Sequence, residues 1–285
     1  MQTLRPLAAL ETGVMFWAGP DPGETLAELK AMGVRCGQLG LPGDLDLACA
    51  EAWRDALAAT DFTITTVFAA YHGESYADKP AVQSTVGFVP PATRVEREKR
   101  TCEVSDFARV LGVPAIATHV GCVPEDLQHP DHIAVRKMVQ RICDYAAERG
   151  QNFALETGQE SAAVLLEFMR GVNRANLGIN FDPANMILYG TGDPIAALEM
   201  LGNQVLSVHC KDGDWPPAGQ PDALGEERAL GAGAVGMERF LRQLTKVGYQ
   251  GPLVIEREAS DPARRLRDIA TGIELLGRLK SGTKQ

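Results

Sequence analysis

Residues 152–182 read NFALETGQESAAVLLEFMRGVNRANLGINFD, with two short apolar runs flanking a longer amphipathic one. Each short run has the length of a strand and is largely apolar on both faces, as expected of a parallel strand covered by helices. The run between them has helical periodicity and is followed by Gly171, a residue type common at helix ends. The stretch therefore predicts a strand, a helix and the next parallel strand.

The same alternation extends over the rest of the chain. Strands are predicted at Thr12–Trp17, Val34–Leu39, Phe62–Ala69, Ala115–His119, Asn152–Thr157, Leu177–Asp182, Val205–Cys210 and Leu253–Glu258. Helices are predicted at Glu24–Met32, Asp46–Ala59, Ala92–Leu111, Ile133–Arg149, Ser161–Arg170, Asp193–Leu201, Val235–Val247 and Pro262–Lys280, with N-caps at Asp21, Ser161 and Asp261. Eight strands alternating with eight helices predict an α/β protein, a single (β/α)8 TIM barrel domain over residues 1–285.

A doubly wound sheet is the alternative to a barrel. It usually lacks a regular eightfold count and needs a nucleotide-binding loop, but no G-x-G-x-x-G follows the first strand and no Walker-type lysine loop is present. Three long connections follow predicted strands, at Ala70–Pro91, Val120–His132 and Lys211–Ala234. In a barrel these connections rise from the catalytic face, so we expect them to form a lid.

The composition narrows the class of partner. The chain has 37 acidic and 28 basic residues and a net charge of −9, which argues against a broad nucleic-acid-binding surface. We expect no membrane partner, since no apolar run is long enough for a signal peptide or a membrane span. Six scattered cysteines predict reduced thiols and a cytoplasmic protein. Whether the chain forms a homo-oligomer is left open.

Polar side chains stand at the ends of four consecutive strands, where a barrel places its active site. They are Glu156, Asp182, His209 and Glu256. One such residue is more simply a satisfied buried polar group. Three adjacent carboxylates, however, repel each other unless protons or a cation separate them. Oxygen ligands with one nitrogen ligand predict one divalent metal ion, Mn²⁺ or Mg²⁺ first, with Co²⁺ or Zn²⁺ also open.

The segments around these residues resemble a known family. ALET (154–157), NFDPANMI (180–187), SVHCKD (207–212), VIERE (254–258) and the whole of Ala229–Glu258 are similar to the xylose-isomerase-like TIM barrel superfamily. Within it, they resemble the sugar phosphate isomerase/epimerase family, in the branch of ketose 3-epimerases and inosose isomerase-dehydratases. The resemblance implies that Glu156, Asp182, His209 and Glu256 hold the metal. It also implies that Glu156 and Glu256 are catalytic, transferring a proton on opposite faces of the sugar through an enediolate.

Two departures from the family pattern bear on the substrate. Many relatives carry a histidine three residues after the strand-six aspartate, where this chain has Asn185. Ketohexose epimerases use an arginine shortly after the strand-seven histidine, where this chain has Lys211, Asp212 and Trp215. Both differences weaken the expectation of a free ketohexose. The first also weakens the endonuclease branch, which needs additional histidines for a three-metal cluster.

Five further residues are substrate-binding candidates: His119, Lys211, Trp17, His72 and Glu160. His119 closes the fourth strand on the catalytic side, and Trp17 closes the first, where its ring can stack on a sugar. Lys211 either contacts a substrate hydroxyl, even as a proton donor, or forms a loop salt bridge. Glu160 either contacts substrate or compensates a helix N-terminus.

The leading hypothesis is a metal-dependent isomerase or epimerase of carbohydrate metabolism that acts on a ketose or keto-sugar. A lyase or dehydratase acting on an inosose or 3-keto-glycoside would use the same site, with Lys211 or His119 as general acid. A non-catalytic sugar-binding barrel is a third hypothesis, and an AP endonuclease-like DNA repair enzyme is the last.

Overall fold

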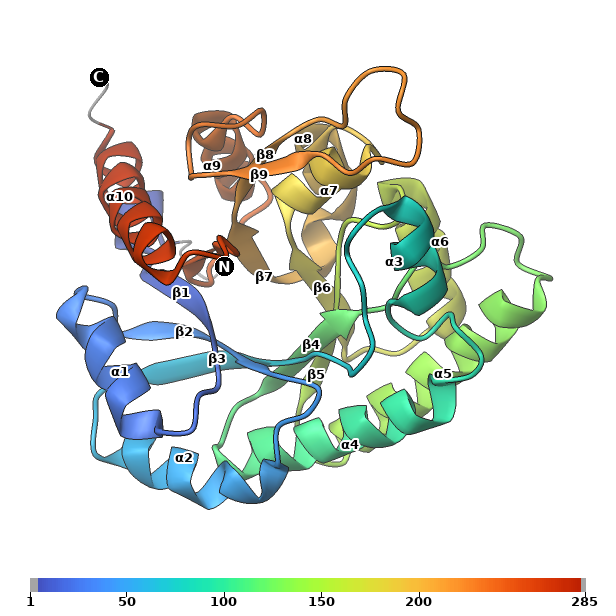
Figure 1. Cartoon of the computed structure of the whole chain (residues 1–285), viewed down its shortest axis with the longest axis horizontal. Helices are drawn as coiled ribbons and strands as arrows, with labels where there is room; N and C mark the ends of the chain where they lie inside the picture. Colours follow the sequence, from blue (N-terminus) through green and yellow to red (C-terminus); the bar gives the residue numbers. More distant parts are fainter. Residues whose placement is uncertain (1–4, 283–285) are drawn as a thin grey trace.

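The computed structural model describes residues 5–282. Eight parallel strands close into a barrel surrounded by helices (Figure 1), in the order β1-β10-β7-β6-β5-β4-β3-β2. The predicted (β/α)8 barrel is therefore confirmed. The barrel strands are β1 (Thr12–Trp17), β2 (Cys36–Leu41), β3 (Thr63–Ala69), β4 (Ala115–His119), β5 (Asn152–Glu156), β6 (Leu177–Phe181), β7 (Val205–Cys210) and β10 (Leu253–Ile255).

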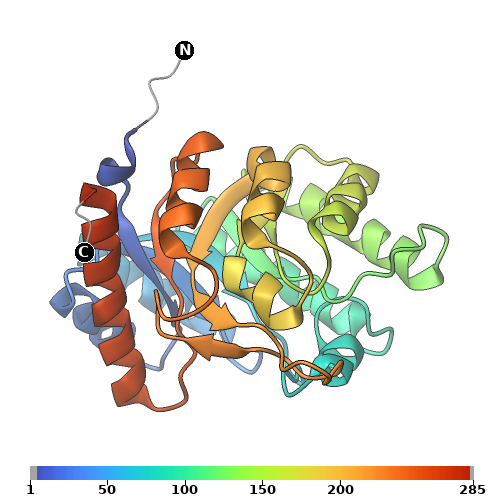
Figure 2. The ribbon, with the colours of Figure 1, turned by 90° about the horizontal axis from the view of Figure 1, so that it is seen from above.

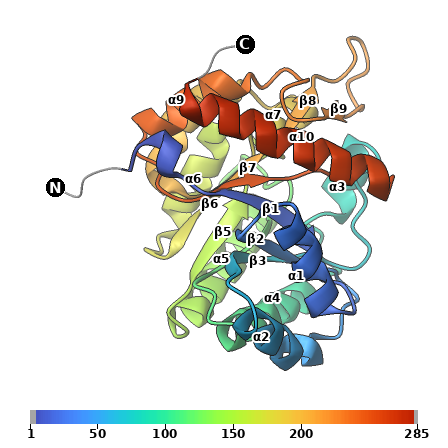
Figure 3. The same ribbon diagram turned by 90° about the vertical axis from the view of Figure 1, so that its left-hand side faces the viewer.

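The helices lie outside the strands. They are α1 (Pro22–Ala31), α2 (Ala50–Ala58), α3 (Lys79–Thr85), α4 (Arg94–Val110), α5 (Pro130–Ala147), α6 (Ala162–Val172), α7 (Pro183–Tyr189), α8 (Pro194–Leu201), α9 (Met237–Lys246) and α10 (Pro262–Ser281), with short 3-10 helices at Leu7–Ala9, Leu47–Cys49 and Gly202–Gln204. The last helix, α10, lies along the first strand (Figures 2 and 3), and Lys280 Nζ donates to Leu10 O and Thr12 Oγ1. This contact closes the ring of helices.

The three predicted helix starts are confirmed. The side chains of Asp21, Ser161 and Asp261 each accept a hydrogen bond from a backbone N–H in the first turn of α1, α6 and α10. Each bond satisfies one of the donors that an α-helix leaves without a partner at its N-terminus.

One predicted helix end is wrong, and another is confirmed with a different role for its glycine. Gly171 lies inside α6, which continues to Val172 and ends on Asn173 with a left-handed φ of 51°, a conformation that asparagine tolerates better than most residues. The helix α8 ends at Leu201, as predicted, but its C-cap Gly202 has a φ of −51° and continues into a 3-10 helix. A Cβ at Gly202 would lie 2.5 Å from Val247 Cγ1, so this glycine allows close packing rather than a helix stop.

Five strands have bounds that differ from the prediction, β3, β5 and β6 by a single residue and β2 and β10 by more. The second strand begins and ends two residues later than expected, since Gly40 continues it; the missing Cβ leaves room for the Trp17 ring, 2.5 Å from where that Cβ would be. The last strand ends at Ile255, so Glu256 stands just beyond it. Similarly, Asp182 follows β6 and is the N-cap of α7, a helix that the sequence prediction missed.

Two of the three long connections contain further elements. The first holds α3, and the third holds an antiparallel pair of short strands, β8 (Asp212–Asp214) and β9 (Glu226–Arg228). We refer to residues 212–228 as the β8–β9 hairpin. Both connections rise from the carboxyl ends of barrel strands and contribute side chains to the cavity described below.

The core has two parts. The larger one lies between strands and helices, and the smaller one is inside the barrel, where Met15, Phe68, Ala117, Ala154 and Val254 pack together. Within residues 5–282, no helix combines the length and apolarity needed to cross a membrane.

Candidate active site

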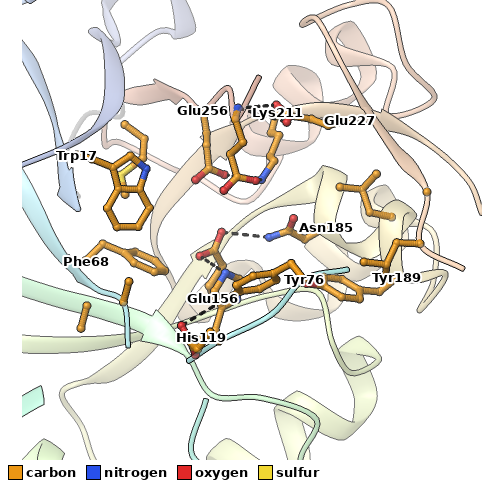
Figure 4. A pocket seen from close by; sticks show the side chains of 18 residues that line it. Trp17, Phe68, Tyr76, His119, Glu156, Asn185, Tyr189, Lys211, Glu227 and Glu256 are labelled. Carbon is orange, nitrogen blue, oxygen red and sulfur yellow. Dashed lines mark hydrogen bonds and ion pairs between the residues drawn. The ribbon is translucent and has the colours of Figure 1, made fainter. Parts of the chain in front are cut away.

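A cavity of about 370 Å³ opens at the carboxyl end of the barrel. This volume is within the usual range for a small-molecule site. Figure 4 shows Trp17 and Phe68 on one wall, Asn185 and Tyr189 opposite them, and Glu156 and Glu256 on either side of the centre. The cavity is thus bounded by rings and carboxylates.

Four side chains meet at this cavity, with one ligand atom from each lying within 4.8 Å of the others: Glu156, Asp182, His209 and Glu256. Glu156 and Glu256 line the cavity, whereas Asp182 and His209 are fully buried behind them. His209 Nδ1 is 3.0 Å from Glu156 Oε1, 3.1 Å from Glu256 Oε2 and 3.6 Å from Asp182 Oδ2. The structure therefore brings together all four predicted metal ligands.

The donor set fits a divalent cation. Asp182 Oδ1 caps α7 by accepting from Ala184 N and Asn185 N. Its Oδ2 is buried and has no hydrogen-bond partner among the described residues. A buried oxygen of this kind is costly unless a cation or donor satisfies it. Three carboxylates and one imidazole are ligands that Mn²⁺ and Mg²⁺ accept.

The charges of these groups are strongly linked. Burial opposes protonation of His209, but Glu256 and Glu156 raise the pKa of its imidazole well above the ordinary value. Burial disfavours the charged form of Glu256, yet His209 and Lys211 hold its pKa well below the usual range. Burial raises the pKa of Asp182 to about 6 in spite of Lys211. Without a metal, cationic side chains balance the carboxylates.

Glu156 is held by two neighbours besides His209, and a third residue orients one of them. Asn185 Nδ2 donates to its Oε1 at 3.2 Å, and His119 Nε2 lies 3.2 Å from its Oε2. Gln159 Nε2 lies 3.0 Å from His119 Nδ1, so an amide N–H donating there leaves the imidazole hydrogen on Nε2, facing the carboxylate. Asn185 therefore takes a place beside Glu156 at the position where many relatives carry histidine.

The sequence left two interpretations of Lys211 open, a substrate contact and a loop salt bridge. The contacts of its ammonium group bear on both. Lys211 Nζ donates to Glu256 Oε2 at 2.9 Å and to Glu258 Oε2 at 2.7 Å, and it lies 3.8 Å from Asp182 Oδ2. Its side chain is 4% exposed and lines the cavity. The salt bridge thus exists, and it is inside the site rather than in a distant loop.

Sequence reasoning missed several residues of the cavity wall: Glu74, Tyr76, Tyr189, Leu188, Leu224, Glu227 and Glu258. Most stand on the two long connections or on α7, where no periodic pattern indicated which side chains turn inward. Glu258 had a signal, since it lies two residues after Glu256 and strand alternation places such residues on one side.

Two of the substrate-binding candidates are not brought to this cavity. His72 lines a separate cavity of about 250 Å³ beside α4, together with Arg97 and Arg100. Glu160 is buried, and neither of its carboxylate oxygens has a hydrogen-bond partner among the described residues. Burial raises the pKa of Glu160 to about 8. Trp17, His119 and Lys211 do line the cavity.

Glu160 makes folding stability depend on pH. Folding raises the pKa of the Glu160 carboxyl from 4.5 to about 8, so between these pH values the folded protein keeps a proton that the unfolded chain has lost. The stability that depends on the neutral carboxyl is present in full below about pH 4.5 and is lost as the pH rises towards 8. Between these values the free energy of unfolding should fall by about 1.4 kcal/mol per pH unit from this group. In Glu160→Gln, urea unfolding at pH 5, 6.5 and 8 should show a weaker decline. Glu167→Gln, an exposed change on α6, is the matched control, and its pH dependence should follow that of wild type. If the free energy of unfolding of E160Q declines with pH as steeply as that of wild type, Glu160 is not the group responsible.

The β8–β9 hairpin is fixed at its base by Asp212. The Asp212 carboxylate accepts from the backbone N–H groups of Gly213, Gly231 and Val235. A Cβ at Gly233 would lie 2.4 Å from Asp212 Oδ1, so this turn requires glycine. Three more contacts tie the hairpin to its neighbours, namely Lys79 N to Asp222 O, Gly225 N to Leu188 O and Glu258 N to Glu227 Oε1.

The barrel, the strand-end quartet and the cavity agree with a family match. Residues 26–279 match the model of the xylose isomerase-like TIM barrel family. The chain belongs to this family. The resemblance inferred from the sequence is therefore confirmed.

Two characterised relatives are similar to this chain over less than half of its length. The chain is 29% identical over 135 residues to the ketose 3-epimerase of Arthrobacter globiformis and 31% identical over 137 residues to the rhizopine catabolism protein MocC of Rhizobium meliloti. These matches cover 43% and 44% of this chain, and the chain matches 40% of the length of each relative.

A solved structure is similar over nearly the whole length. The xylose isomerase domain protein from Planctomyces limnophilus is 44% identical, with a TM-score of 0.91, and the match covers 96% of this chain and 98% of that one.

Proposed function

We propose that this protein is a metal-dependent sugar isomerase or epimerase that acts on a ketose or keto-sugar. The observation that carries the proposal is the pair of buried glutamates, Glu156 and Glu256, on two sides of one cavity and beside one four-donor cluster (Figure 4). The family membership and the local similarity to a ketose 3-epimerase support it.

The divalent ion held by Glu156, Asp182, His209 and Glu256 would supply positive charge that stabilises the enediolate oxygens. Glu156 and Glu256 each keep a carboxylate at the cavity wall, one to remove the proton beside the carbonyl and the other to return it. Glu256 remains ionised at neutral pH because His209 and Lys211 lower its pKa against the effect of burial, so its carboxylate is in the form that can accept a proton.

The surrounding residues position the substrate. Trp17 is 41% exposed and Phe68 presents its ring to the same wall, so both suit the apolar face of a sugar. His119 and Asn185 hold Glu156 in place. Among the described residues of the cavity wall, Lys211 is the single lysine or arginine. Its positive charge is already paired with the carboxylates of Glu256 and Glu258.

A lyase or dehydratase acting on an inosose or 3-keto-glycoside is the second candidate. Lys211 favours it, since an ammonium 2.9 Å from Glu256 Oε2 is placed to protonate a leaving hydroxide next to the abstracted proton. The two reactions begin in the same way and differ in whether a leaving group stands next to the enediolate.

One experiment separates the candidates. Protein supplied with Mn²⁺ or Mg²⁺ is incubated in D₂O with a panel of ketoses, keto-glycosides and inososes, and products are followed by NMR and mass spectrometry. Deuterium uptake with the carbon skeleton and substituents intact supports an isomerase or epimerase, whereas release of water or an aglycone supports a lyase. No deuterium uptake and no product with any substrate, from metal-loaded protein, counts against both.

A further inference from the structure

The interior of the barrel is polar directly beneath the metal-binding quartet. Gln38 on β2, Asn180 on β6 and Ser207 on β7 are all buried, the two amides completely. Barrel interiors are normally filled by branched apolar side chains, and buried amides are costly unless they are hydrogen-bonded. These three residues therefore require an explanation beyond packing.

Hydrogen bonds fix the orientation of both amides. Asn180 Oδ1 accepts from Ser207 Oγ and, at 3.0 Å, from Gln38 Nε2. With its nitrogen committed to Asn180, the Gln38 amide turns Oε1 towards His209 Nε2, 3.0 Å away. An amide oxygen only accepts hydrogen bonds, so this contact favours a hydrogen on His209 Nε2. Asn180 Nδ2 lies 3.2 Å from Nε2 and 3.4 Å from Nδ1, and it favours neither ring nitrogen.

The other ring nitrogen of His209 faces the carboxylates. Nδ1 lies 3.0 Å from Glu156 Oε1 and 3.1 Å from Glu256 Oε2. In a neutral imidazole only one nitrogen carries hydrogen. In the neutral ring that a metal ion requires, the hydrogen held on Nε2 by Gln38 leaves the lone pair of Nδ1 pointing into the cluster of carboxylates.

We propose that Gln38 is a positioning residue that selects the His209 tautomer needed for metal binding, with Nδ1 as the ligand atom. Asn180 and Ser207 hold Gln38 in the orientation that does this. The inference rests on the proposed metal-dependent function. Outer partners of this kind orient a metal-binding histidine and strengthen it as a ligand without touching the ion.

The first test compares metal affinity in two buried glutamine variants. Gln38→Met removes the acceptor with little change in volume. Gln151→Met is the matched control: Gln151 is also buried, but it bonds to Ser105 and Val113 instead of the site. Calorimetric titration with Mn²⁺ should show a Kd about 10- to 100-fold weaker in Q38M and one close to wild type in Q151M. Both variants lose buried hydrogen bonds, so a loss of stability alone does not produce this contrast.

Two more variants keep the proposal testable if Q38M does not fold. Gln38→Glu retains an acceptor oxygen opposite Nε2 and should bind Mn²⁺ at least as tightly as wild type. Ser207→Ala removes one donor to Asn180 and should weaken the Kd measurably, by about three- to tenfold. Unchanged affinity in Q38M, or in S207A where Q38M does not fold, overturns the role of Gln38.

The tautomer has its own readout. In ¹⁵N-histidine-labelled protein loaded with Mg²⁺, two-bond ¹⁵N–¹H spectra should show the His209 hydrogen on Nε2. A hydrogen on Nδ1 contradicts the inference, while the proposed function survives. Wild-type protein that binds no divalent ion overturns the proposed function and this inference together.

Discussion

Changing either Glu156 or Glu256 to Gln should lower kcat by about 10²- to 10⁴-fold, the usual cost of removing a general base. Glutamine keeps the size and one ligand oxygen of each side chain but not the basic charge. The metal content should therefore be retained while proton transfer fails. Turnover of the true substrate, metal analysis and a thermal melt on each variant provide the measurement.

The two variants should differ in one respect. If the glutamates act on opposite faces of the substrate, each single variant loses epimerisation, but one still exchanges the substrate proton with D₂O on its own face. Glu238→Gln, a surface change on α9 where Glu238 pairs with Arg242, is the control for substitution as such. Wild-type turnover by folded, metal-loaded E156Q and E256Q would move the chemistry to His119 or Lys211 and favour the lyase.

The second large effect is expected for Asp182→Ala. Wild-type protein should bind about one divalent ion per chain, and D182A should bind none, because it loses the buried oxygen that has no hydrogen-bond partner among the described residues. Elemental analysis and titration with Mn²⁺ measure this directly.

Asp182 is also the N-cap of α7, so D182A loses a capping interaction worth about 0.5–2 kcal/mol. Asp193→Ala separates the two effects. Asp193 caps α8 through the same pattern of bonds, to Ile195 N and Ala196 N, and lies outside the cavity wall. D193A should lose similar stability and keep its metal. Metal-free wild-type protein would remove the basis of the mechanism, and three ions per chain would revive the endonuclease alternative.

The barrel and its quartet were predictable because both follow from short-range patterns. Each strand is a brief apolar run, and its last inward-facing residue, two positions after the preceding inward-facing one, points to the rim of the barrel. For Glu156, Asp182, His209 and Glu256 this rule was sufficient, even though β6 and β10 end one residue before Asp182 and Glu256.

What the sequence did not predict depends on contacts between distant segments. Asp212 pairs with Arg228 in the β8–β9 hairpin, and both short strands are too polar to show a strand pattern. The role proposed for Gln38 depends on its contact with His209, which lies 171 residues away along the chain. The second strand was placed two residues too early because Gly40 resembles a turn residue until the Trp17 ring is seen against it.

The hydrogen bonds that join the β8–β9 hairpin to α3, to the end of α7 and to Glu258 link the walls of the entrance into one frame. Leu188 and Leu224 line the cavity from this frame, and in the proposed function they would limit substrate size while Glu156 and Glu256 transfer the proton below. The two tasks are encoded in separate parts of the chain. Diversification of residues 215–224 is accordingly expected to change the substrate range of the proposed enzyme while leaving Glu156, Asp182, His209 and Glu256 in place.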